Sequence, residues 1–517
     1  MNIMCGIMAV LYSTVPSTQL TELFFKGQHR GPDNSQTVEL ENAWLGFHRL
    51  AINGLDDSSN QPFQMDDVYL ICNGEIYNYK ELFRAMDVVP FSKSDCEVIL
   101  HLYLKYGIEY TVQAIQASEF AFVIYDKRIQ TMYVVRDPYG VRPLYMGRDE
   151  GMTYFASELK MMPAMTTSHV RPGTITTVTA ESVSTAHYCS LPSINPVKVP
   201  ACHVYSVLYD CVKRRVENTD RPIACLLSGG LDSSIVAYLV NTVRKEMGIT
   251  TPLETYSIGL PHAADLYYAQ RMADFLESNH TNVILSESDF LHAIPEVIHA
   301  IESRDTTTVR ASVGNYLVCK YIRQHSQAKV IFNGDGADEV CGGYLYLKRA
   351  PNELEFDKEC RRLVTDIHLF DAQRSDRSIS SHGLESRTPF LDRAFVELYM
   401  SLRPSVRYTQ VEKQFLREAF AGTMPNEILW RKKEAFSDGV SSLERSWFTI
   451  IQESIPQYIM DKYNSERPNC TPEQFYYKNV YDSLFNVDLH QYYWMPKYSG
   501  TTDCSARTLE NYFTQTR

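Results

Sequence analysis

The pattern of hydrophobic and polar positions changes near residue 190. Before that point, short apolar runs are separated by Gly, Pro, Asp and Asn: AWLGFHRLAI, VYLICNGEIYN, FAFVIYD, TMYVVRD, PLYMG and MTYFASE. Runs of this length and composition predict strands, whereas SDCEVILHLYLKYG has the spacing of a helix. The mixture predicts an α+β domain of layered sheets over residues 5–190.

Beyond a proline-rich linker at residues 191–200, LPSINPVKVP, strands and helices alternate. PIACLL predicts a strand, SGGLDSS a turn, IVAYLVNTVRKEM a helix and LETYSIGL a second strand; AKVIFNGDGADE repeats the step from apolar strand to glycine turn. This alternation indicates an α/β domain with an open parallel sheet over residues 201–517, mostly helical after about Gly342. Ligands of such sheets bind at the carboxyl ends of the strands, where these turns lie.

Composition and charge narrow the class of protein. The net charge is -12, which disfavours binding to nucleic acid or to an anionic membrane surface. No apolar run is long enough to span a bilayer, and the first residues lack the features of a signal peptide. The 12 cysteines form no CxxC pair and the 14 histidines show no zinc-site spacing. We therefore expect a cytoplasmic protein with reduced thiols and no nucleic-acid or membrane partner.

The most specific motif is SGGLDSS at residues 228–234. Its glycines let backbone N–H groups converge on an anion, its serines add hydroxyl donors, and the helix that follows points its positive end at the same place. Asp232 lies inside this anion site, and a carboxylate among phosphates requires a bridging divalent cation, so the motif implies Mg²⁺. A plain Gly/Ser turn is the alternative, and the strand before and helix after disfavour it. The GK[ST] ending of a Walker A loop is absent.

This turn resembles the PP-loop of ATP pyrophosphatases, which cleave ATP to AMP and pyrophosphate and adenylate a substrate. The second glycine turn, NGDGADE at Asn333–Glu339, supports the resemblance. Asp338 is expected to supply a second carboxylate for magnesium, and Asp335 to face the reaction centre. A solvated turn is the alternative, plausible for Glu339 but not for the two aspartates together with Asp232.

Cys5 lies in the opening run MNIMCGIMAV and has two interpretations. It is either a buried structural thiol at the start of a strand, or a nucleophile that works once residues 1–4 are gone. The second is attractive because an N-terminal cysteine carries its own general base, an α-amino group that titrates near pH 8. The residues themselves leave the choice open.

With both halves considered, the chain closely resembles the glutamine-hydrolysing asparagine synthetases over nearly its full length. The first half carries, in order, CGI at Cys5, HRGPD at His29–Asp33, HRLAI at His48–Ile52, NGEIYN at Asn73–Asn78, SDCEV at Ser94–Val98 and RDPYGVRPLY at Arg136–Tyr145. The second half adds SIG at Ser257–Gly259, TTVRAS at Thr307–Ser312, GADEVCGGY, HGLESRTPFLD at His382–Asp392, RKKEAFSDGV at Arg431–Val440 and WMPKYSGTTDCSARTL. The resemblance implies a class II glutamine amidotransferase domain with the N-terminal-nucleophile (αββα) fold, followed by a PP-loop adenylating domain.

The resemblance also implies residue roles in the glutaminase half. Cys5 attacks the glutamine carboxamide to form a thioester, and Asn73 with the backbone N–H of Gly74 forms the oxyanion hole. Arg49 clamps the glutamine carboxylate. The α-ammonium and the lining of the site are assigned to Asp95, Glu75, Leu50, Ala51, Ile52 and Asn53.

In the synthetase half, the resemblance implies attack of the aspartate side chain on the α-phosphorus of ATP, giving β-aspartyl-AMP. Ammonia from the first site, carried through an apolar tunnel, then displaces AMP and yields asparagine. ATP binding is assigned to Leu227, Ser228, Gly229, Gly230, Asp232, Ser233, Ile258, Asn333 and Gly334, the aspartate and AMP site to Thr307, Arg310, Asp335 and Lys433, and Mg²⁺ to Asp232 and Asp338. The family also implies a homodimer.

Three departures from the family pattern keep alternatives open. Residues 1–4 precede Cys5, Asp335 replaces the usual Glu, and Asn333 replaces the usual Ser. A carboxylate one methylene shorter is displaced by about 1.5 Å, and about 1 Å of misplacement can cost a hundredfold in rate. The alternatives are an amidotransferase acting on another carboxylate, a glutaminase-impaired form that uses ammonia, and a non-catalytic regulatory descendant.

Overall fold

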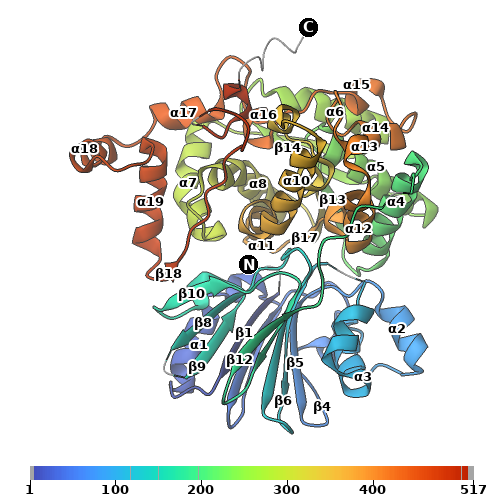
Figure 1. The fold of residues 1–517 in the computed structure, drawn as a ribbon, viewed down its shortest axis with the longest axis vertical. Coiled ribbons are helices and arrows are strands. Elements are labelled where there is room, and N and C mark those ends of the chain that lie inside the picture. The colour runs from blue at the N-terminus through green and yellow to red at the C-terminus, as the bar shows by residue number, and fades with distance from the viewer. Residues whose placement is uncertain (1–4, 117, 150, 196, 502, 510–517) are drawn as a thin grey trace.

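The computed structural model describes residues 5–509 apart from 117, 150, 196 and 502, and it divides into a sheet-rich half and a helix-rich half (Figure 1). In the first half, two sheets pack face to face, and their strands are antiparallel except for the pairing of β18 with β10. One has the order β18-β10-β8-β9-β1-β3-β2, with bounds β1 Gly6–Leu11, β2 Asn34–Glu39, β3 Ala43–Arg49, β8 Tyr145–Asp149, β9 Met152–Ala156, β10 Thr166–His169 and β18 Asp488–Leu489. The other has the order β12-β11-β7-β6-β5-β4, with bounds β4 Phe63–Met65, β5 Val68–Gly74, β6 Phe120–Asp126, β7 Thr131–Arg136, β11 Thr174–Val178 and β12 Val183–His187.

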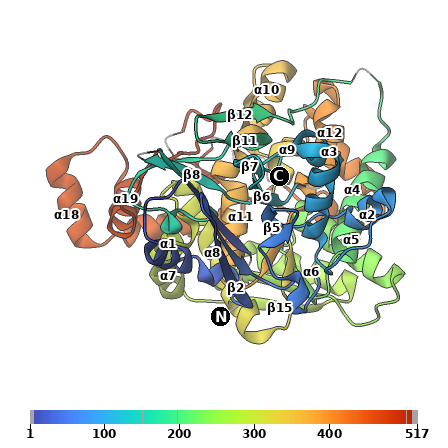
Figure 2. The same ribbon diagram turned by 90° about the horizontal axis from the view of Figure 1, so that it is seen from below.

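Apolar side chains fill the space between these sheets and also cover their outer faces. Ile7 and Leu45 of one sheet share a core with Ile71 and Val123 of the other. Helices α2 (Tyr79–Met86) and α3 (Val98–Ala114) pack outside the six-stranded sheet, and α1 (Ser17–Phe25) packs outside the seven-stranded sheet. The layers are helix, sheet, sheet, helix, which confirms the predicted αββα fold (Figure 2).

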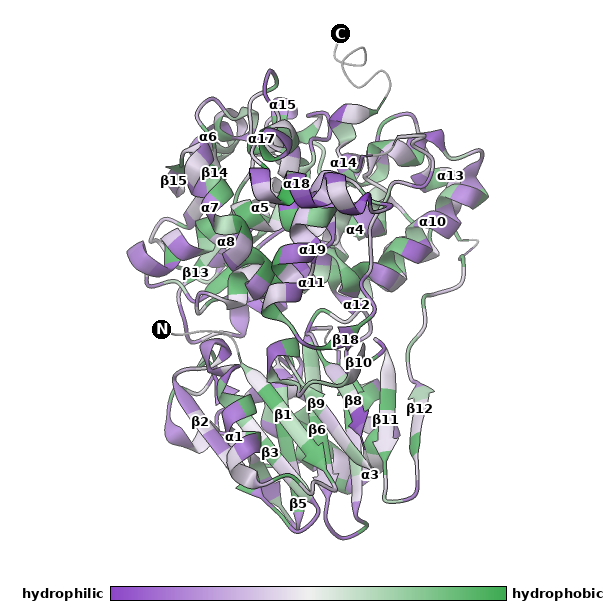
Figure 3. Ribbon diagram, turned by 90° about the vertical axis from the view of Figure 1, so that its left-hand side faces the viewer, coloured by the Kyte–Doolittle hydropathy of each residue, from purple (hydrophilic) through white to green (hydrophobic). Residues whose placement is uncertain are grey.

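The second half contains a parallel sheet of five strands in the order β15-β14-β13-β16-β17. The bounds are β13 Ile223–Leu226, β14 Glu254–Gly259, β15 Asn279–Ile284, β16 Val330–Phe332 and β17 Glu385–Arg387. Alternate residues of β13 face two different cores, Cys225 on one side and Ala224 on the other, so both faces of the sheet are covered. Figure 3 shows the hydrophobic residues concentrated on the strands and on the inner helices.

Helices account for most of this half, including the part after about Gly342 that was predicted to be mostly helical. Their bounds are α4 Ala201–Glu217, α5 Leu231–Glu246, α6 Ala264–Leu276, α7 Glu287–Ile301, α8 Thr306–His325, α9 Ala337–Cys341, α10 Glu353–Asp366, α11 Asp371–Ser380, α12 Arg393–Ser401, α13 Pro404–Arg407, α14 Gln414–Ala419, α15 Asn426–Leu429, α16 Phe436–Gly439, α17 Trp447–Glu453, α18 Gln457–Glu466 and α19 Pro472–Leu484. Within the described residues, no helix is both long and apolar enough to cross a membrane.

Two local features differ from the sequence expectations. Helix α5 begins at Leu231, with Gly230 as its N-cap, so Asp232 lies in the first helical turn and not in the preceding loop. Strand β18 comes from the end of the chain, yet it pairs in parallel with β10 of the first half, Asp488 opposite Thr166. The late chain therefore contributes to both halves.

Candidate functional sites

Cys5 lies immediately before β1 and faces the end of β3. Its Sγ is 3.5 Å from the carbonyl oxygen of Leu50, to which it donates, and it accepts from the N–H of the same residue at 3.3 Å. Burial raises the pKa of this thiol to about 12, so the thiolate is scarce at neutral pH. A nucleophilic Cys5 therefore needs a nearby base. Residues 1–4, whose removal was predicted, lie outside the described residues.

Asn73 is the penultimate residue of strand β5, and its side chain is fully buried. Neither its amide nitrogen nor its amide oxygen has a hydrogen-bond partner among the described residues. Buried polar atoms are normally paired, because an unpaired one costs about 1–3 kcal/mol. A free buried amide of this kind is suited to a donor that waits for a substrate oxygen.

Two buried carboxylates flank the same end of β5. Asp95 accepts from the N–H of Ile76 at 2.6 Å, and burial raises the pKa of Asp95 to about 6. Glu75 accepts from Asn53 at 2.6 Å and from Asn218 at 3.1 Å, and burial followed by the charge of Asp95 raises its pKa well above the usual range. This pair is suited to a cationic ligand group, which would favour the charged form of both carboxylates.

Arg49 is the last residue of β3, and its guanidinium is already hydrogen-bonded. Its Nη1 donates to Asp56 O at 2.8 Å and to Asn60 Oδ1 at 2.7 Å, and its Nη2 donates to the carbonyls of Asn53 and Gly54. The loop that follows β3 thus wraps around the guanidinium. The predicted lining residues Leu50, Ala51 and Ile52 are all buried here.

A pocket lies at the carboxyl ends of the parallel strands, as the sequence predicted. Of the predicted residues, it is lined by Leu227, Ser228, Gly230, Asp232, Ser233, Ile258, Thr307, Asn333, Gly334, Asp335, Asp338 and Lys433. Gly229 and Arg310 do not line it. Side chains that sequence reasoning missed include Lys413, Glu412, Arg431, Tyr344, Asp371 and Arg374.

The SGGLDSS turn joins β13 to α5 in the predicted strand–turn–helix arrangement. Gly229 has φ +70°, and an added Cβ would lie 2.3 Å from the backbone of Tyr268, so only glycine fits. Ser228 and Ser233 hold the turn closed through a 3.1 Å contact between their hydroxyls. The second glycine turn packs directly on the first, since a Cβ at Gly334 would lie 2.8 Å from Asp232 Cβ.

Asp232 and Asp338 converge on one point, where a lysine ammonium lies. Lys413 Nζ is 2.7 Å from Asp232 Oδ1 and 2.5 Å from Asp338 Oδ1. Lys433 Nζ contacts the other oxygen of Asp338 at 2.5 Å. Burial opposes ionisation of Asp338, but the two lysines outweigh it and hold its pKa below the usual range. Two carboxylates that share a cation position beside a phosphate turn fit the donor set that Mg²⁺ takes with nucleotide phosphates.

Asp335 also lines the pocket and is held by a cation of its own. Its Oδ1 is 2.7 Å from Arg374 Nη2, and its N–H donates to Asn333 Oδ1 at 3.1 Å. The Asn333 amide nitrogen donates to Ser375 at 2.8 Å and to Ser386 at 3.0 Å. Asn333, which stands where the family usually has Ser, therefore connects the second glycine turn to α11 and β17. Asp335, although shorter than the usual Glu, still reaches the guanidinium of Arg374.

Arg310 of helix α8 is placed away from the pocket lining. Its guanidinium donates to both oxygens of Glu473 and to both oxygens of Asp503, all at 2.5–2.9 Å. Its predicted contact with substrate stays a prediction.

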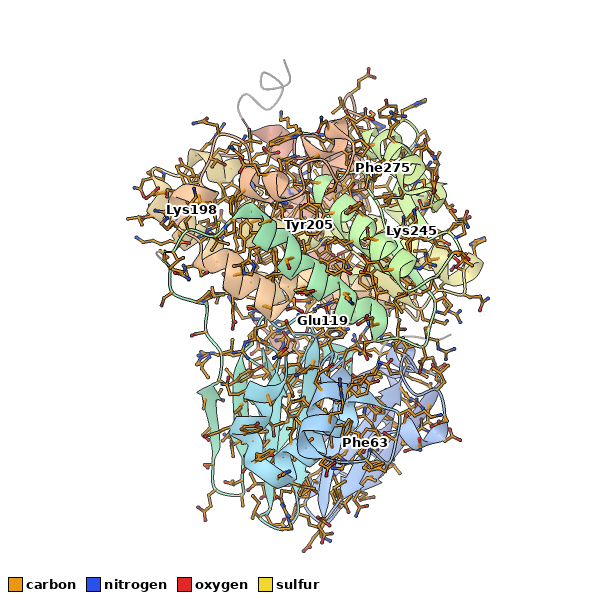
Figure 4. All side chains as sticks on the ribbon, turned by 90° about the vertical axis from the view of Figure 1, so that its right-hand side faces the viewer. Phe63, Glu119, Lys198, Tyr205, Lys245 and Phe275 are labelled. Carbon is orange, nitrogen blue, oxygen red and sulfur yellow. The ribbon has the colours of Figure 1, made fainter. Side chains whose placement is uncertain are left out.

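Buried charged side chains occupy the junction of the two halves, where the resemblance implied an apolar passage. Glu119, at the junction in Figure 4, pairs with Arg215 at 3.0 Å and accepts from the N–H of Thr388 at 3.0 Å. This buried set also includes Arg30, Arg142, Arg377, Arg387, Glu158, Glu302, Asp376, Glu385 and Asp392. The path of ammonia past them stays a prediction.

Comparison with known proteins identifies the chain. Residues 4–212 match the family model of the glutamine amidotransferase domain, and residues 203–358 and 348–495 match that of asparagine synthase. An amidotransferase domain joined to a synthase domain defines the class. The chain is 38% identical to the asparagine synthetases [glutamine-hydrolyzing] of Pongo abelii and Homo sapiens and 37% identical to that of Gallus gallus, each over 98% of this chain and 99% of the relative. It belongs to the family of glutamine-hydrolysing asparagine synthetases.

Among solved structures, the glutamine phosphoribosylpyrophosphate amidotransferase from B. subtilis matches 54% of this chain and 81% of its own, with a TM-score of 0.33 and 15% identity.

Proposed function

We propose that this enzyme makes asparagine from aspartate, glutamine, ATP and water, releasing glutamate, AMP and pyrophosphate. Family membership over nearly the whole chain supports the reaction. The observation that carries the proposal is the convergence of Asp232 and Asp338 beside the glycine turn at residues 228–234. The other half of the chain holds the Cys5 thiol and the buried Asn73 amide, which has no hydrogen-bond partner among the described residues.

In the glutaminase half, Cys5 Sγ attacks the side-chain carbonyl carbon of glutamine. The carbonyl oxygen becomes an oxyanion that the Asn73 amide and the Gly74 N–H stabilise, and ammonia leaves as the thioester forms. Water then hydrolyses the thioester to glutamate. Because burial keeps the thiol protonated, the proton needs a base, and the α-amino group of a chain beginning at Cys5 supplies it.

Charge complementarity orients the glutamine. Arg49 binds the α-carboxylate of glutamine. To do so, its guanidinium gives up part of its hydrogen bonds to the loop that follows β3. Asp95 and Glu75 bind its α-ammonium, which restores the negative charge that burial disfavours. Backbone and side chains of residues 50–53 line the remainder.

In the synthetase half, the pocket holds ATP with its phosphates on the turn at residues 228–234. We assign nucleotide contacts to Leu227, Ser228, Gly229, Gly230, Ser233, Ile258, Asn333 and Gly334. Mg²⁺ held by Asp232 and Asp338 would neutralise phosphate charge, and Lys413 then has to leave the point between the two carboxylates. Lys433 stays within reach of the same phosphates.

The aspartate β-carboxylate attacks the α-phosphorus, the bond to pyrophosphate breaks, and β-aspartyl-AMP forms. Ammonia then attacks the activated carbonyl, loses a proton and displaces AMP. We assign Asp335 to the reacting centre, because its Oδ2, which has no hydrogen-bond partner among the described residues, can accept that proton. We assign Thr307 and Arg310 to the aspartate side of the site. We also propose that the chain divides into two domains at residues 191–200, forms a homodimer and acts in the cytoplasm.

The test compares nitrogen donors and acceptors in one preparation. Asparagine formation is measured with glutamine and with ammonia, and pyrophosphate release is measured with aspartate and with a panel of other carboxylic acids. We expect both donors to work and pyrophosphate release to require aspartate. If pyrophosphate is released with another acid but not with aspartate, the proposed function is wrong and the enzyme is an amidotransferase for a different carboxylate.

A further inference from the structure

The segment that carries Lys433 has little structure of its own. Residues 431–437 all line the pocket, and the only helix in this part of the chain is α16, which has four residues. We refer to residues 431–442 as the pocket loop. The backbone hydrogen bonds inside the pocket loop run between Ala435 and Ser441, beyond Lys433. The part that carries this lysine is therefore held by contacts from elsewhere, one of which is the 2.9 Å hydrogen bond from the Lys433 N–H to Glu412 Oε1.

A single arginine from the far end of the chain supplies such contacts. Arg507 is almost fully buried, and its guanidinium bonds to the pocket loop at several points. Its Nε donates to Glu434 Oε1 at 3.0 Å, its Nη2 to Asp438 O at 2.8 Å and its Nη1 to Ser442 O at 2.6 Å. Only a guanidinium offers donors in a planar fork that reaches three acceptors at once.

A second contact from the same tail fixes the middle of the loop. Ser505 Oγ donates to Asp438 Oδ1 at 2.7 Å. The tail is itself anchored, because Asp503 forms a two-point ion pair with Arg310 of helix α8 at 2.8–2.9 Å. The tail therefore connects a core helix to the loop that lines the pocket.

We propose that Arg507 is a positioning residue for the adenylation step. By holding the pocket loop, it places Lys433 against Asp338, next to the position that Lys413 takes between Asp232 and Asp338, with the Lys433 ammonium 2.5 Å from Asp338 Oδ2. The inference rests on the proposed function only in that the pocket binds ATP. It assigns a role in synthesis to a residue outside the pocket and near the carboxyl end of the chain.

The experiment compares Arg507→Met with the control Arg445→Met in the full chain. Arg445 follows the pocket loop, but its side chain pairs at the surface with Glu287 and Glu453. Three quantities are measured: aspartate-dependent pyrophosphate release, glutamine hydrolysis, and trypsin cleavage after Arg431, Lys432 and Lys433, with the cut sites identified by mass spectrometry.

We expect Arg507→Met to lower kcat for pyrophosphate release by about tenfold to a hundredfold, since about 1 Å of misplacement has an effect of this size. Trypsin should cut its pocket loop at least about tenfold faster, as expected when a protecting contact of about 1.4 kcal/mol or more is lost. Glutamine hydrolysis and its KM should stay near wild type. Arg507→Lys, which keeps the charge but not the fork, should recover part of the rate, and Arg445→Met should match wild type throughout.

Unchanged pyrophosphate release together with an unchanged trypsin rate in Arg507→Met would overturn the proposal. If Arg507→Met does not give folded protein, Ser505→Ala, which removes one hydroxyl contact, takes its place and is judged by the same two readouts. If the wild type itself releases no pyrophosphate with aspartate, the proposed function fails, while the trypsin comparison still decides whether the tail holds the loop.

Discussion

Arg387 reaches across the junction of the two halves to Glu75, with 3.3 Å between its Nη2 and the carboxylate oxygen Oε2. Arg387 ends strand β17 of the parallel sheet, and Glu75 follows strand β5 of the glutaminase half. The neighbouring residue on β17, Ser386, accepts a hydrogen bond from Asn333 in the pocket. One short strand therefore touches both candidate sites.

Glu75→Gln should separate the two nitrogen donors. The amide keeps the shape but loses the charge expected to bind the α-ammonium of glutamine, so glutamine-dependent asparagine formation should fall at least about tenfold, as for loss of one charge-assisted contact of 1.5–3 kcal/mol. Ammonia-dependent formation should stay within about twofold, a difference of about 0.4 kcal/mol. Glu81→Gln, at an exposed pair with Arg84, is the matched control. An equal fall with both donors would count against a role in glutamine binding.

Cys5→Ala should abolish glutamine hydrolysis and spare asparagine formation from ammonia, because the thiol takes part only in the first half-reaction. Cys202→Ala, which alters an exposed cysteine, should change neither rate. Intact-mass measurement of each preparation establishes whether its chain begins at Cys5. A preparation that retains residues 1–4 and still hydrolyses glutamine would exclude the α-amino group as the base.

The pH dependence of glutamine use should report Asp95. Its pKa is raised to about 6 by burial, so its carboxylate is protonated in the free enzyme below that pH and cannot balance the α-ammonium. We expect kcat/KM for glutamine to fall as the pH drops through about 6, while kcat/KM for ammonia-dependent synthesis, expressed per unprotonated ammonia, shows no such limb. Asp95→Asn should lower glutamine use at all pH values and remove the limb. A limb that survives in this variant belongs to another group.

Lys413→Met should make the enzyme depend on magnesium for stability. Asp232 and Asp338 would lose the cation between them, and removing one partner of a buried ion pair costs about 3–5 kcal/mol. The lysines depress the pKa of Asp338, so the ion pair stabilises the fold fully above the unfolded pKa of 3.8 and progressively less as the pH falls below it. The stability that the variant loses is therefore one that the wild type has at neutral pH. Magnesium should therefore raise the melting temperature of the variant at pH 7 more than that of wild type.

The matched control for this prediction is Lys348→Met, which removes a partly exposed lysine paired with Glu412 near the same pocket. Its response to magnesium should equal that of wild type. Equal magnesium shifts in all three proteins would show that the cation position between Asp232 and Asp338 is not a metal site.

The sequence predicted both folds and most of the pocket because local signals determine them. Glycine turns after apolar strands place Ser228 and Gly334 at the same sheet edge whatever the surrounding sequence is. Lys413 was missed because it lies in a region without a motif and reaches Asp232 only through tertiary packing. The environment of Arg310 was missed for the same reason, since its partner Asp503 is 193 residues away in the chain.

The buried charges at the junction were also beyond sequence reasoning. Arg215 and Glu119 each look like ordinary surface residues in the sequence, and only the docking of the two halves shows that both are fully buried. Pattern-based interpretation assigns charged residues to solvent by default, which holds for isolated domains and fails at an interface.

The parallel pairing of β18 with β10 has a consequence for synthesis of the protein on the ribosome. The residue that closes this sheet edge, Asp488, lies 322 positions after its partner Thr166. While the nascent chain is growing, the β10 edge is left with unpaired backbone groups and is open to association with other chains until nearly the last segment has emerged. A glutaminase half expressed by itself would keep that edge uncovered permanently, and it should aggregate more readily than the whole enzyme.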